Sequence, residues 1–492
     1  VGIIAISAMT DSELLDLSRV NTWALSLEEL HAVKAHYADP AVREAREQMG
    51  LPGEPTDAEM EVLAQTWSEH CKHKIFASSI RYENDETGRK EEINSLYKTC
   101  IQGSTAAIRR RLGDKDFCRS VFKDNAGVVA FNETHDVCIK VETHNSPSAL
   151  DPYGGALTGI VGVNRDPMGT GLGAELVCNT DVFCFASPFY EGTLPPRLLH
   201  PRRVMEGVRL GVEDGGNKSG VPTVNGSVVF DERYLGKPLV YCGTVGMMPA
   251  TIHGKPGHYK KARKGDVVIM AGGRIGKDGI HGATFSSEEL HEGSPATAVQ
   301  IGDPITQRKL YDCIIRARDM GLYTAITDNG AGGLSSSVGE MAEDTGGCSI
   351  DLAKALLKYD GLKPWEILLS EAQERMTLAV PKENLERFLR LAEEMDVEAT
   401  PLGEFTDSGY FHVSYGEKTV ACLPMDFMHD GVPQMRLEAR WQRPEERPLA
   451  GRDGRDEGGA LEKALAAKGL DQRSLLLAML GRLNICSKEY LI

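Results

Sequence analysis

The stretch HDVCIKVETHNSPSALDPYGG, residues 135–155, alternates apolar and polar side chains and then runs into turn-forming residues. The alternation predicts a β-strand over 136–143 whose valines and isoleucine share one face. Lys140 and Glu142 lie on the opposite face, and His144 continues this polar row if the strand runs on. A cation, a carboxylate and an imidazole along one edge can hold a nucleotide phosphate, a metal ion and a reacting group respectively. The alternative interpretation is a solvated strand face.

The segment VNRDPMGTGLGAEL, residues 163–176, brings an arginine and a carboxylate close to three alternating glycines. Arg165 offers a two-pronged fork to phosphate, and Asp166 suits a hard cation such as magnesium. The glycines let backbone amides approach an anion. The spacing is not that of a dinucleotide-binding fingerprint, and no helix clearly follows. A surface turn is the alternative interpretation.

The segment AITDNGAGGLSSSVGEMAEDTGG, residues 325–347, predicts a strand that ends in Asp328, a glycine loop, and a helix entered through 335–337. A carboxylate at the carboxyl end of a strand, facing a helix N-terminus, is where α/β domains hold metal-bound phosphate. An Asp-Asn-Gly turn is the competing interpretation. Because no G-x-x-x-x-G-K-[ST] motif occurs, any ATP site is not a P-loop.

The stretch WSEHCKHK, residues 67–74, places two histidines and a cysteine within four positions. A capping box that starts at Thr56 predicts a helix carrying this stretch near its end. His70 and His73 are three residues apart and can share a metal on such a helix, whereas the zinc-protease pattern needs a spacing of four and an intervening Glu. A zinc site is therefore disfavoured. A helix-end histidine with a functional or capping role remains, and Cys71 is expected to be a packing residue.

The composition indicates a globular protein of two or three domains, because 492 residues exceed one core. A formal net charge of -16 argues against a nucleic-acid surface, so an anionic ligand would need locally concentrated cations. The eleven cysteines are scattered and never spaced C-x-x-C, which fits reduced thiols better than a disulfide framework. No apolar run approaches a membrane span of ~18 residues. These features predict a cytoplasmic protein without membrane contact.

The chain divides into four predicted regions by pattern. Residues 1–80 have helical spacing, residues 81–255 alternate short strands with glycine-rich turns and helices, and residues 256–440 follow a strand–helix order typical of an α/β domain. Residues 441–492 begin with a charged Pro/Gly-rich linker and stop directly after an apolar helical pattern. Both ends of the chain look cut, which predicts a piece of a longer polypeptide.

Seven stretches together resemble one enzyme family. In chain order they are TWSEHCKHKIF, KVETHNSPSALDPYGGALTGIVGVNRD, PTVNGSVVFDERYLGKPLVYCG, DGIHGATFSSEEL, AVQIGDP, ITDNGAGGL and LLSEAQERM. They are similar, from about residue 20 to 430, to the first synthetase half of phosphoribosylformylglycinamidine synthase, a member of the aminoimidazole ribonucleotide synthetase superfamily. The final NICSKEYLI resembles the start of that family's second half.

The resemblance implies a mixed α+β and α/β fold: a helical linker, a ferredoxin-like N-terminal synthetase domain, then a second α/β synthetase domain. It implies an ATP-dependent carbon–nitrogen ligase of purine biosynthesis. Such an enzyme converts formylglycinamide ribonucleotide to formylglycinamidine ribonucleotide with ammonia derived from glutamine. The amide oxygen is phosphorylated to an iminophosphate, from which ammonia displaces phosphate.

The matched motifs also imply residue roles. The implied active-site histidines are His70 and His144, the ATP contacts are Lys140 and His73, and the magnesium ligands are Glu142, Asp166 and Asp328. The implied substrate site comprises Thr143, His144, Asn145, Ser146, Arg165, Gln300, Glu371, Ala372 and Gln373. Two positions depart from the family pattern, since Ser146 stands where many relatives carry a histidine and His73 where small-type relatives carry a tyrosine.

Partners follow from the same resemblance. Ammonia must come from a fused glutaminase domain or a partner subunit, because no cysteine lies in a G-x-C-x-G elbow. The second synthetase half is an expected partner, and the isolated chain is expected to self-associate through an uncovered apolar sheet face. Two other functions stay open at this point: a half that only holds a structural nucleotide, and another kinase-like superfamily member that acts on a different small substrate.

Overall fold

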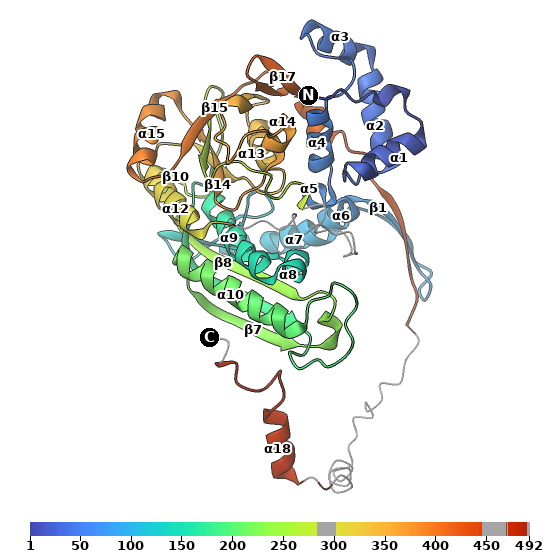
Figure 1. Ribbon diagram of the computed structural model, residues 1–492, viewed down its shortest axis with the longest axis vertical. Coiled ribbons are helices and arrows are strands. Elements are labelled where there is room, and N and C mark those ends of the chain that lie inside the picture. Colours follow the sequence, from blue (N-terminus) through green and yellow to red (C-terminus); the bar gives the residue numbers. More distant parts are fainter. Residues whose placement is uncertain (283–301, 445–468, 470, 490–492) are drawn as a thin grey trace.

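The computed structural model describes residues 1–282, 302–444, 469 and 471–489 (Figure 1). Within these ranges the chain forms a helical N-terminal region, two large sheets with helices packed on them, and a small sheet that joins distant segments. None of the described helices has the length and apolar character needed to cross a lipid bilayer.

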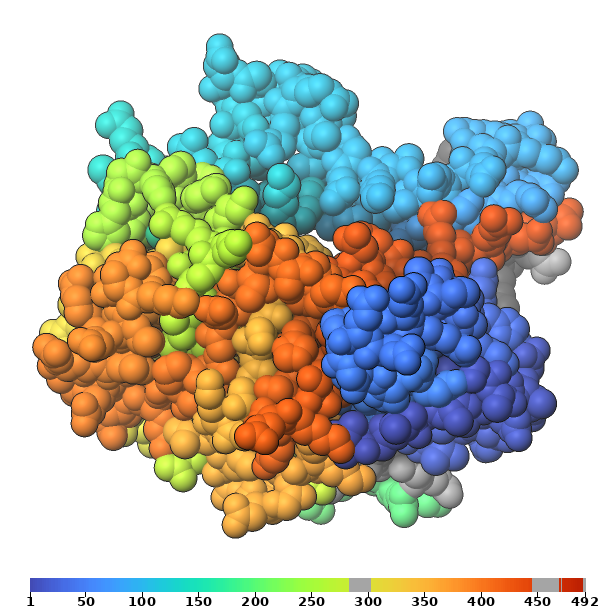
Figure 2. All heavy atoms as spheres, turned by 90° about the horizontal axis from the view of Figure 1, so that it is seen from above, coloured from blue at the N-terminus to red at the C-terminus, as the bar shows by residue number. Residues whose placement is uncertain are grey.

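The N-terminal region is helical, as the sequence predicts. Capping boxes at Ser26 and Thr56 close the first turns of two helices. In each box, the glutamate three residues after the cap accepts a hydrogen bond from the backbone N–H of the cap residue. The helices are η1 (Ile6–Ala8), α1 (Asp11–Val20), α2 (Leu27–Ala38), α3 (Pro40–Gln48) and α4 (Asp57–Thr66). Figure 2 shows the blue N-terminal helices seated against the orange C-terminal part of the chain.

The prediction that the α4 helix carries residues 67–74 is wrong. Helix α4 ends at Thr66, and a separate short helix, α5 (Glu69–Lys72), follows it. His73 then adopts a left-handed conformation with φ +48° and separates α5 from α6 (Lys74–Ala77). The break is fixed by Trp67, which is fully buried and donates from Nε1 to the Met428 carbonyl at 3.0 Å. Replacing a buried tryptophan with alanine typically lowers the free energy of unfolding by about 3–5 kcal/mol.

A three-stranded sheet joins two remote segments of the chain. Its order is β18-β1-β2, and β18 (Arg436–Trp441) runs parallel to β1 (Ser79–Asn84), which pairs antiparallel with β2 (Lys90–Asn94). In Figure 2 the orange-red segment of β18 lies beside the light-blue segment of β1. The predicted region boundaries at 80/81 and 440/441 therefore fall inside paired strands.

A six-stranded mixed sheet follows, in the order β3-β4-β5-β8-β6-β7. Its strands are β3 (Cys118–Ser120), β4 (Gly127–Ala130), β5 (His135–Thr143), β6 (Glu175–Phe185), β7 (Thr223–Phe230) and β8 (Leu239–Pro249). Helices α9 (Pro152–Gly169) and α10 (Pro201–Ser219) pack on one face, where Ile160, Val208 and Val240 share an apolar core. On the other face Ile139 and Val141 are 50% and 39% exposed.

A seven-stranded sheet forms the second large unit, in the order β12-β14-β11-β15-β13-β16-β17. The strands are β11 (Val267–Gly272), β12 (Ala325–Asp328), β13 (Cys348–Asp351), β14 (Arg375–Val380), β15 (Ala399–Phe405), β16 (Tyr410–Tyr415) and β17 (Lys418–Pro424). Alternate residues of β11 enter two different cores, Ile269 packing with α12 (Pro304–Asp319) and α15 (Leu385–Glu394), and Val268 with α13 (Gly333–Glu343) and α14 (Pro364–Leu369). The unit is therefore a three-layer α/β domain.

The helical region shares the second of these cores. Leu30, Leu63 and Trp67 belong to the same apolar cluster as Val268 and Leu334, so α2 and α4 dock on the seven-stranded unit. A buried ion pair joins α3 to α4, with Arg46 Nη1 2.9 Å from Glu59 Oε1, and the same carboxylate accepts a hydrogen bond from the Cys422 N–H of β17 at 2.9 Å. The remaining elements are α7 (Gly103–Leu112), η2, a π-helical turn (Tyr97–Gln102), η3 (Gly113–Lys115), α8 (Asn145–Leu150), η4 (Glu232–Tyr234), β9 (Thr251–Ile252), β10 (Lys255–Pro256), η6 (Leu352–Lys354), η7 (Lys382–Asn384), α16 (Met425–Asp430) and α18 (Gln472–Leu480).

The last described segment returns to the six-stranded sheet. After α18, Asn484 accepts a hydrogen bond at Oδ1 from the Phe230 N–H at 2.6 Å and donates from Nδ2 to the Phe230 carbonyl at 2.9 Å. Leu483 packs beside the apolar core under that sheet. The side-chain amide thus pairs with the end of β7, which is an edge strand.

Candidate active site

A cavity of about 1710 Å³ lies where the helical region, the six-stranded sheet and the α/β unit meet. Among the residues that the structure describes, its lining includes eight lysines and arginines and eight acidic residues. The formal charges of these side chains therefore balance, whereas the chain as a whole carries a formal net charge of -16. This local concentration of cations is what an anionic ligand of an acidic protein requires.

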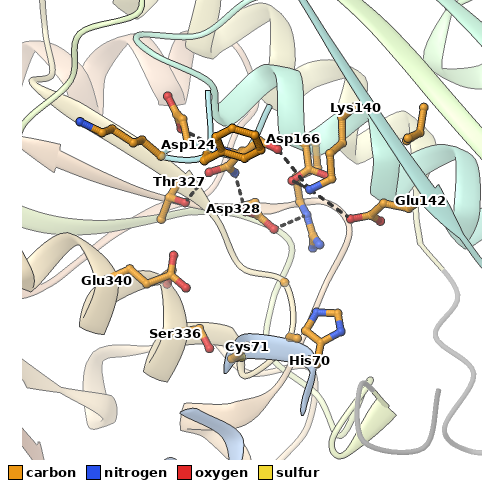
Figure 3. Close-up of a pocket in the computed structure, with 18 of the residues that line it drawn as sticks. His70, Cys71, Asp124, Lys140, Glu142, Asp166, Thr327, Asp328, Ser336 and Glu340 are labelled. Atoms are coloured by element: carbon orange, nitrogen blue, oxygen red, sulfur yellow. Dashed lines mark hydrogen bonds and ion pairs between the residues drawn. The ribbon is translucent and has the colours of Figure 1, made fainter. Parts of the chain in front are cut away.

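Helix α5 presents His70 to this cavity (Figure 3). The helix is anchored behind the histidine, because Lys72 donates from Nζ to the His429 carbonyl at 2.5 Å. Burial lowers the pKa of His70, and the nearby Glu142 carboxylate only partly opposes this effect. The imidazole is therefore mainly neutral near pH 7, and it can accept a proton or a hydrogen bond.

Strand β5 supplies Lys140 and Glu142 on the face that alternation predicts. Lys140 Nζ lies 3.5 Å from Glu142 Oε1 and 3.5 Å from Asp166 Oδ1, and it donates to the Asn125 carbonyl at 3.1 Å. Burial alone would lower the pKa of Lys140, but the carboxylates of Asp166 and Glu142 raise it. The ammonium group is therefore held permanently charged beside the cavity, and the solvated-strand interpretation is wrong.

Arg165 and Asp166 lie in the last turn of the long helix α9, and both are buried. The surface-turn interpretation is therefore wrong. Arg165 Nε is 3.0 Å from Asp328 Oδ2, and its Nη1 donates to the carbonyls of Asn329 and Ala372 at 3.0 and 2.5 Å. Burial would lower the pKa of Arg165, but Asp328 and the other nearby carboxylates raise it. Nη1 is thus engaged by two carbonyl oxygens, while Nε lies beside the Asp328 carboxylate without a hydrogen bond among the described residues.

A glycine allows this ion pair to form. A Cβ atom at Gly330 would lie 2.7 Å from Asp328 Oδ2 and 3.0 Å from Arg165 Nη2. Any side chain at this position would push the pair apart. The predicted strand, loop and helix are confirmed here, with Asp328 ending β12, although α13 begins at Gly333 and not within 335–337.

The three candidate metal ligands, Glu142, Asp166 and Asp328, line the same cavity. They do not converge on one point. Among the described residues, no group of three or more Asp, Glu, His or Cys side chains has metal-binding geometry. Burial, together with Glu142 and Asp328, raises the pKa of Asp166 well above its usual range. A buried carboxylate whose ionisation is opposed by neighbouring carboxylates fits a hard divalent cation, which would relieve the same repulsion.

The candidate substrate residues after β5 sit at the wall of the cavity. His144 Nδ1 and Ser146 Oγ are buried and have no hydrogen-bond partner among the described residues. Buried polar atoms of this kind usually have partners, so these two are suited to contacting a ligand. Burial lowers the pKa of His144. Asn145, in contrast, accepts a hydrogen bond at Oδ1 from the Val240 N–H at 2.9 Å and so also holds the loop against β8.

The remaining predicted residues differ in position. Thr143, His73, Glu371 and Gln373 line the cavity, and Gln373 Nε2 donates to Glu371 Oε1 at 3.3 Å. Ala372 lies behind the wall, where its carbonyl accepts from Arg165. Gln300 lies outside the described residues.

Several lining residues were missed from the sequence. Lys260 Nζ lies 2.5 Å from Asp124 Oδ1 and donates to the carbonyls of Gly169 and Ile326, so it links the two large units. Asn125 donates from Nδ2 to Asp328 Oδ1 at 2.6 Å. The adjacent Asp-Asn pair in FKDNAG, residues 122–127, resembles a turn and gave no other signal.

Glu340 was also missed. It stands one turn after Ser336 on α13 and projects toward the cavity in Figure 3. Burial and the neighbouring Asp328 raise the pKa of Glu340 to about 7. Its position could not be read from the sequence, where it appears as one polar residue on a helix.

Three family models match successive parts of the chain. The formylglycinamide ribonucleotide amidotransferase linker domain matches residues 14–74, the N-terminal domain of AIR synthase related proteins matches 123–248, and the C-terminal domain of the same proteins matches 263–416. Each match falls on one of the structural units described above.

Curated relatives and solved structures agree with these models. The chain is 34% identical over 450 residues to phosphoribosylformylglycinamidine synthase subunit PurL of Thermoplasma volcanium, covering 90% of this chain and 52% of that protein. It is 36% identical over 400 residues to the same subunit of Methanopyrus kandleri, covering 80% and 49%. The chain thus spans about half the length of the curated relatives it matches.

Among solved structures, T. maritima PurL complexed with FGAR superposes with a TM-score of 0.60 at 28% identity, covering 82% of this chain and 57% of that one. PurL complexed with ATP gives 0.57 at 26% identity, covering 80% and 55%, and PurLQS of Thermotoga maritima also gives 0.57 at 26%, covering 80% and 54%. With the linker and both AIR-synthase-related domains in order along one polypeptide, the chain belongs to the phosphoribosylformylglycinamidine synthase family.

Proposed function

We propose that this chain is the first synthetase half of an enzyme that uses ATP and ammonia to convert formylglycinamide ribonucleotide to formylglycinamidine ribonucleotide. The observation that carries the proposal is the cavity itself, where a neutral histidine, a charged lysine and three carboxylates from different units line one space. The PurL structures with FGAR and with ATP support the same ligands here. The region division at about 80, 255 and 440 remains part of this proposal.

Charge stabilisation is the main task of the cavity. Phosphorylation of the amide oxygen requires that the negative charge on the transferred phosphoryl group be neutralised and that the reacting groups be held in line. Lys140 would contact the ATP phosphates, because it is charged and lies at the cavity wall. Glu142, Asp166 and Asp328 would hold Mg²⁺, which when bound supplies further positive charge to the phosphates.

The histidines would act at the amide. His70 and His144 have lowered pKa values because they are buried, so each can accept a hydrogen bond or a proton near pH 7. Loss of a proton from the amide nitrogen accompanies iminophosphate formation, and attacking ammonia must later lose a proton as well. We assign proton acceptance at these nitrogens to the two histidines.

The substrate site would comprise Thr143, His144, Asn145, Ser146, Arg165, Gln300, Glu371, Ala372 and Gln373. The unsatisfied Ser146 Oγ supports a direct contact even though many relatives carry a histidine there. Arg165 fixes the carbonyls of Asn329 and Ala372, so its main effect would be to shape this wall.

The partners would be a second synthetase half and a source of ammonia. The chain spans about half of its relatives, and Ile139 and Val141 expose apolar surface on the sheet face away from α9 and α10. We propose that the second half covers this face, that a glutaminase domain or subunit supplies ammonia, and that the protein acts in the cytoplasm.

Ammonia-dependent turnover tests the proposal. The chain is combined with the remaining polypeptide, and ADP and formylglycinamidine ribonucleotide are measured with ammonium chloride, ATP and Mg²⁺. Full loss of product in His70→Asn and His144→Asn, but not in the surface control His31→Asn, is expected. Unchanged turnover in both variants would favour a half that only holds nucleotide. ADP formation only with another small substrate would favour a different kinase-like activity.

A further inference from the structure

The loop between β3 and β4 contacts two of the charged residues that line the cavity. Asn125, in this loop, donates from Nδ2 to Asp328 Oδ1 at 2.6 Å, and its main-chain carbonyl accepts from Lys140 Nζ at 3.1 Å. Its Oδ1 accepts from Thr327 Oγ1 at 3.3 Å. Asn125 therefore connects a cation of the six-stranded unit with a carboxylate of the seven-stranded unit, and it has no role in the function proposed above.

The orientation of the Asn125 amide is fixed by its partners. An ionised carboxylate only accepts hydrogen bonds, so the amide nitrogen faces Asp328, and the amide oxygen is left to accept from the Thr327 hydroxyl. The end of α9 leaves room for this arrangement, because a Cβ atom at Gly169 would lie 2.8 Å from Asn125 Nδ2. The amide is thus enclosed by residues of both large units.

The preceding residue, Asp124, fixes the loop itself. Its Oδ1 accepts from the Asn125 N–H at 2.8 Å and lies 2.5 Å from Lys260 Nζ, and its Oδ2 accepts from the Gly171 N–H at 2.7 Å. The sequence predicts that the glycines at 169–173 bring backbone amides to an anion, and the anion that Gly171 contacts here is the Asp124 carboxylate. In Figure 3 Asp124 lies in the upper half of the view, together with the labelled Asp328 and Lys140.

These contacts keep the Lys140 ammonium apart from the Asp328 carboxylate. Two other carboxylates lie 3.5 Å from Lys140 Nζ, and Asp328 contributes less than they do to the raised pKa of this lysine. Asp328 has partners of its own, because Oδ1 accepts from Asn125 and Oδ2 lies 3.0 Å from Arg165 Nε. A direct pair between Lys140 and Asp328 would leave the ammonium less available to a phosphate.

We propose that Asn125 is a positioning residue, whose side-chain amide orients Asp328 and whose main-chain carbonyl holds Lys140, so that one residue sets the separation of these two charges. The assignment rests on the proposed function, in which Lys140 contacts the ATP phosphates and Asp328 is a magnesium ligand. Hydrogen bonds to a metal-binding carboxylate commonly set its orientation and its affinity for the metal. When the amide is removed, Asp328 Oδ1 loses its donor and is open to the Lys140 ammonium.

Isothermal titration of the full chain with inorganic tripolyphosphate, in a buffer that contains EDTA, tests the Lys140 part of the assignment without a metal or a reaction. Asn125→Ala removes the amide but keeps the main-chain carbonyl, and it should weaken tripolyphosphate binding about tenfold. Asn125→Asp keeps the size of the side chain but places a second carboxylate beside Asp328, so it should weaken binding further. Lys140→Met should abolish binding. Asn217→Ala, at an exposed position on α10 outside the cavity lining, is the matched control and should bind as the wild type does.

Thermal unfolding with the non-hydrolysable analogue AMPPCP tests the Asp328 part. Mg²⁺ should stabilise the AMPPCP complex of the wild-type chain, and the Mg²⁺ concentration that gives half of this stabilisation should rise about tenfold in Asn125→Ala. A residue that only supports the fold would lower the unfolding temperature without changing this concentration or the tripolyphosphate affinity.

Wild-type affinity for tripolyphosphate in a folded Asn125→Ala variant would overturn the assignment and leave the proposed function standing. If Asn125→Ala does not fold, Thr327→Val takes its place, because it removes the donor to Asn125 Oδ1 and keeps Asn125 itself. This variant should weaken tripolyphosphate binding about threefold, and unchanged binding would show that Asn125 only supports the fold. Absence of binding to the wild-type chain, or binding that Lys140→Met leaves unchanged, would instead reject the proposed function itself.

Discussion

Arg165 Nε lies 3.0 Å from Asp328 Oδ2, and this ion pair joins the last turn of α9 to the end of β12 in the other large unit. The same guanidinium binds two backbone carbonyls, so it acts as a fixed joint between the units. The cavity wall depends on this joint, because Asp328 is one of its candidate metal ligands.

Arg165→Lys tests the joint. Lysine keeps the charge but cannot contact Asp328 and the carbonyls of Asn329 and Ala372 together. We expect the free energy of unfolding to fall by about 2 kcal/mol, as buried acceptors lose their donors. Chemical denaturation measures this loss, with the exposed Arg19→Lys as control. Wild-type stability combined with a raised KM for the ribonucleotide would show that Arg165 is released to contact the substrate directly.

Asp166→Asn tests the magnesium assignment. The raised pKa of Asp166, caused by burial and by Glu142 and Asp328, means that a neutral amide should be tolerated in the fold. We expect wild-type or higher thermal stability, loss of the stabilisation that Mg²⁺ with AMPPCP gives the wild type, and at least 100-fold lower ammonia-dependent turnover. Asp344→Asn alters another cavity-lining carboxylate and should retain both properties. If Mg²⁺ with AMPPCP still stabilised the Asp166→Asn variant as it does the wild type, Asp166 would not be a magnesium ligand.

Glu340 makes stability depend on pH. Its pKa is raised from 4.5 to about 7 by burial and Asp328, with Glu343 adding and with Lys260 and His429 opposing. Below pH 4.5 both folded and unfolded chains hold the proton, so no stability is lost. Between pH 4.5 and 7 only the unfolded chain releases the proton of this carboxyl group, so the free energy of unfolding falls as the pH rises. Above about pH 7 the decrease in the free energy of unfolding is constant.

Glu340→Gln should therefore be more stable than wild type at pH 8 and equal to it near pH 4.5. The difference is on the order of 1 kcal/mol, because Glu340 is in contact with solvent in the cavity. Denaturation midpoints at several pH values measure it, and Glu343→Gln, which loses a partner of His429, should not show this gain. A constant difference across the pH range would contradict the assignment.

Parts of the site were predictable because they depend on local periodicity. Alternation in β5 placed Lys140 and Glu142 on one face, and the strand–loop–helix order placed Asp328 at a strand end; both are confirmed. Residues 152–169 were not predicted as a helix, since their many glycines disfavour one. Packing explains the glycines: a Cβ at Gly155 would lie 2.4 Å from the Ser148 backbone nitrogen.

Other contacts could not be predicted because they join residues far apart in sequence. Lys260 reaches Asp124 and the carbonyl of Ile326, and no spacing along the chain reports such a contact. The end of α4 was misplaced for a similar reason, since the Trp67 indole bonds to Met428 more than 350 residues away. Tertiary contacts decided these positions over local propensity.

This chain should have no glutaminase activity of its own. None of its eleven cysteines lies in a nucleophile elbow, and burial raises the pKa of Cys71, the one cysteine among the described residues that line the cavity. A thiol with a raised pKa is a poor nucleophile near pH 7. Incubation of the purified chain with glutamine should release no glutamate above background, whereas ammonium chloride should support turnover once the remaining polypeptide is present. Glutamate release that Cys71→Ser abolishes would contradict this expectation.

The isolated chain should self-associate through the outer face of the six-stranded sheet. On β5, Ile139 and Val141 are 50% and 39% exposed on the face opposite α9 and α10, and isolated proteins rarely leave a contiguous apolar sheet face in water. A second copy can cover this face when the second half is absent. Sedimentation velocity should show a dimer at micromolar concentration, and Ile139→Glu should convert it to monomer because a charge cannot be buried unpaired in such an interface. Phe189→Glu changes a 71%-exposed aromatic outside the sheet and should leave the dimer intact.

The dimer should also be nearly inactive with ammonia and ATP and should give way to a one-to-one active complex when the remaining polypeptide is added. A fully active monomer would show that the first half needs no partner surface.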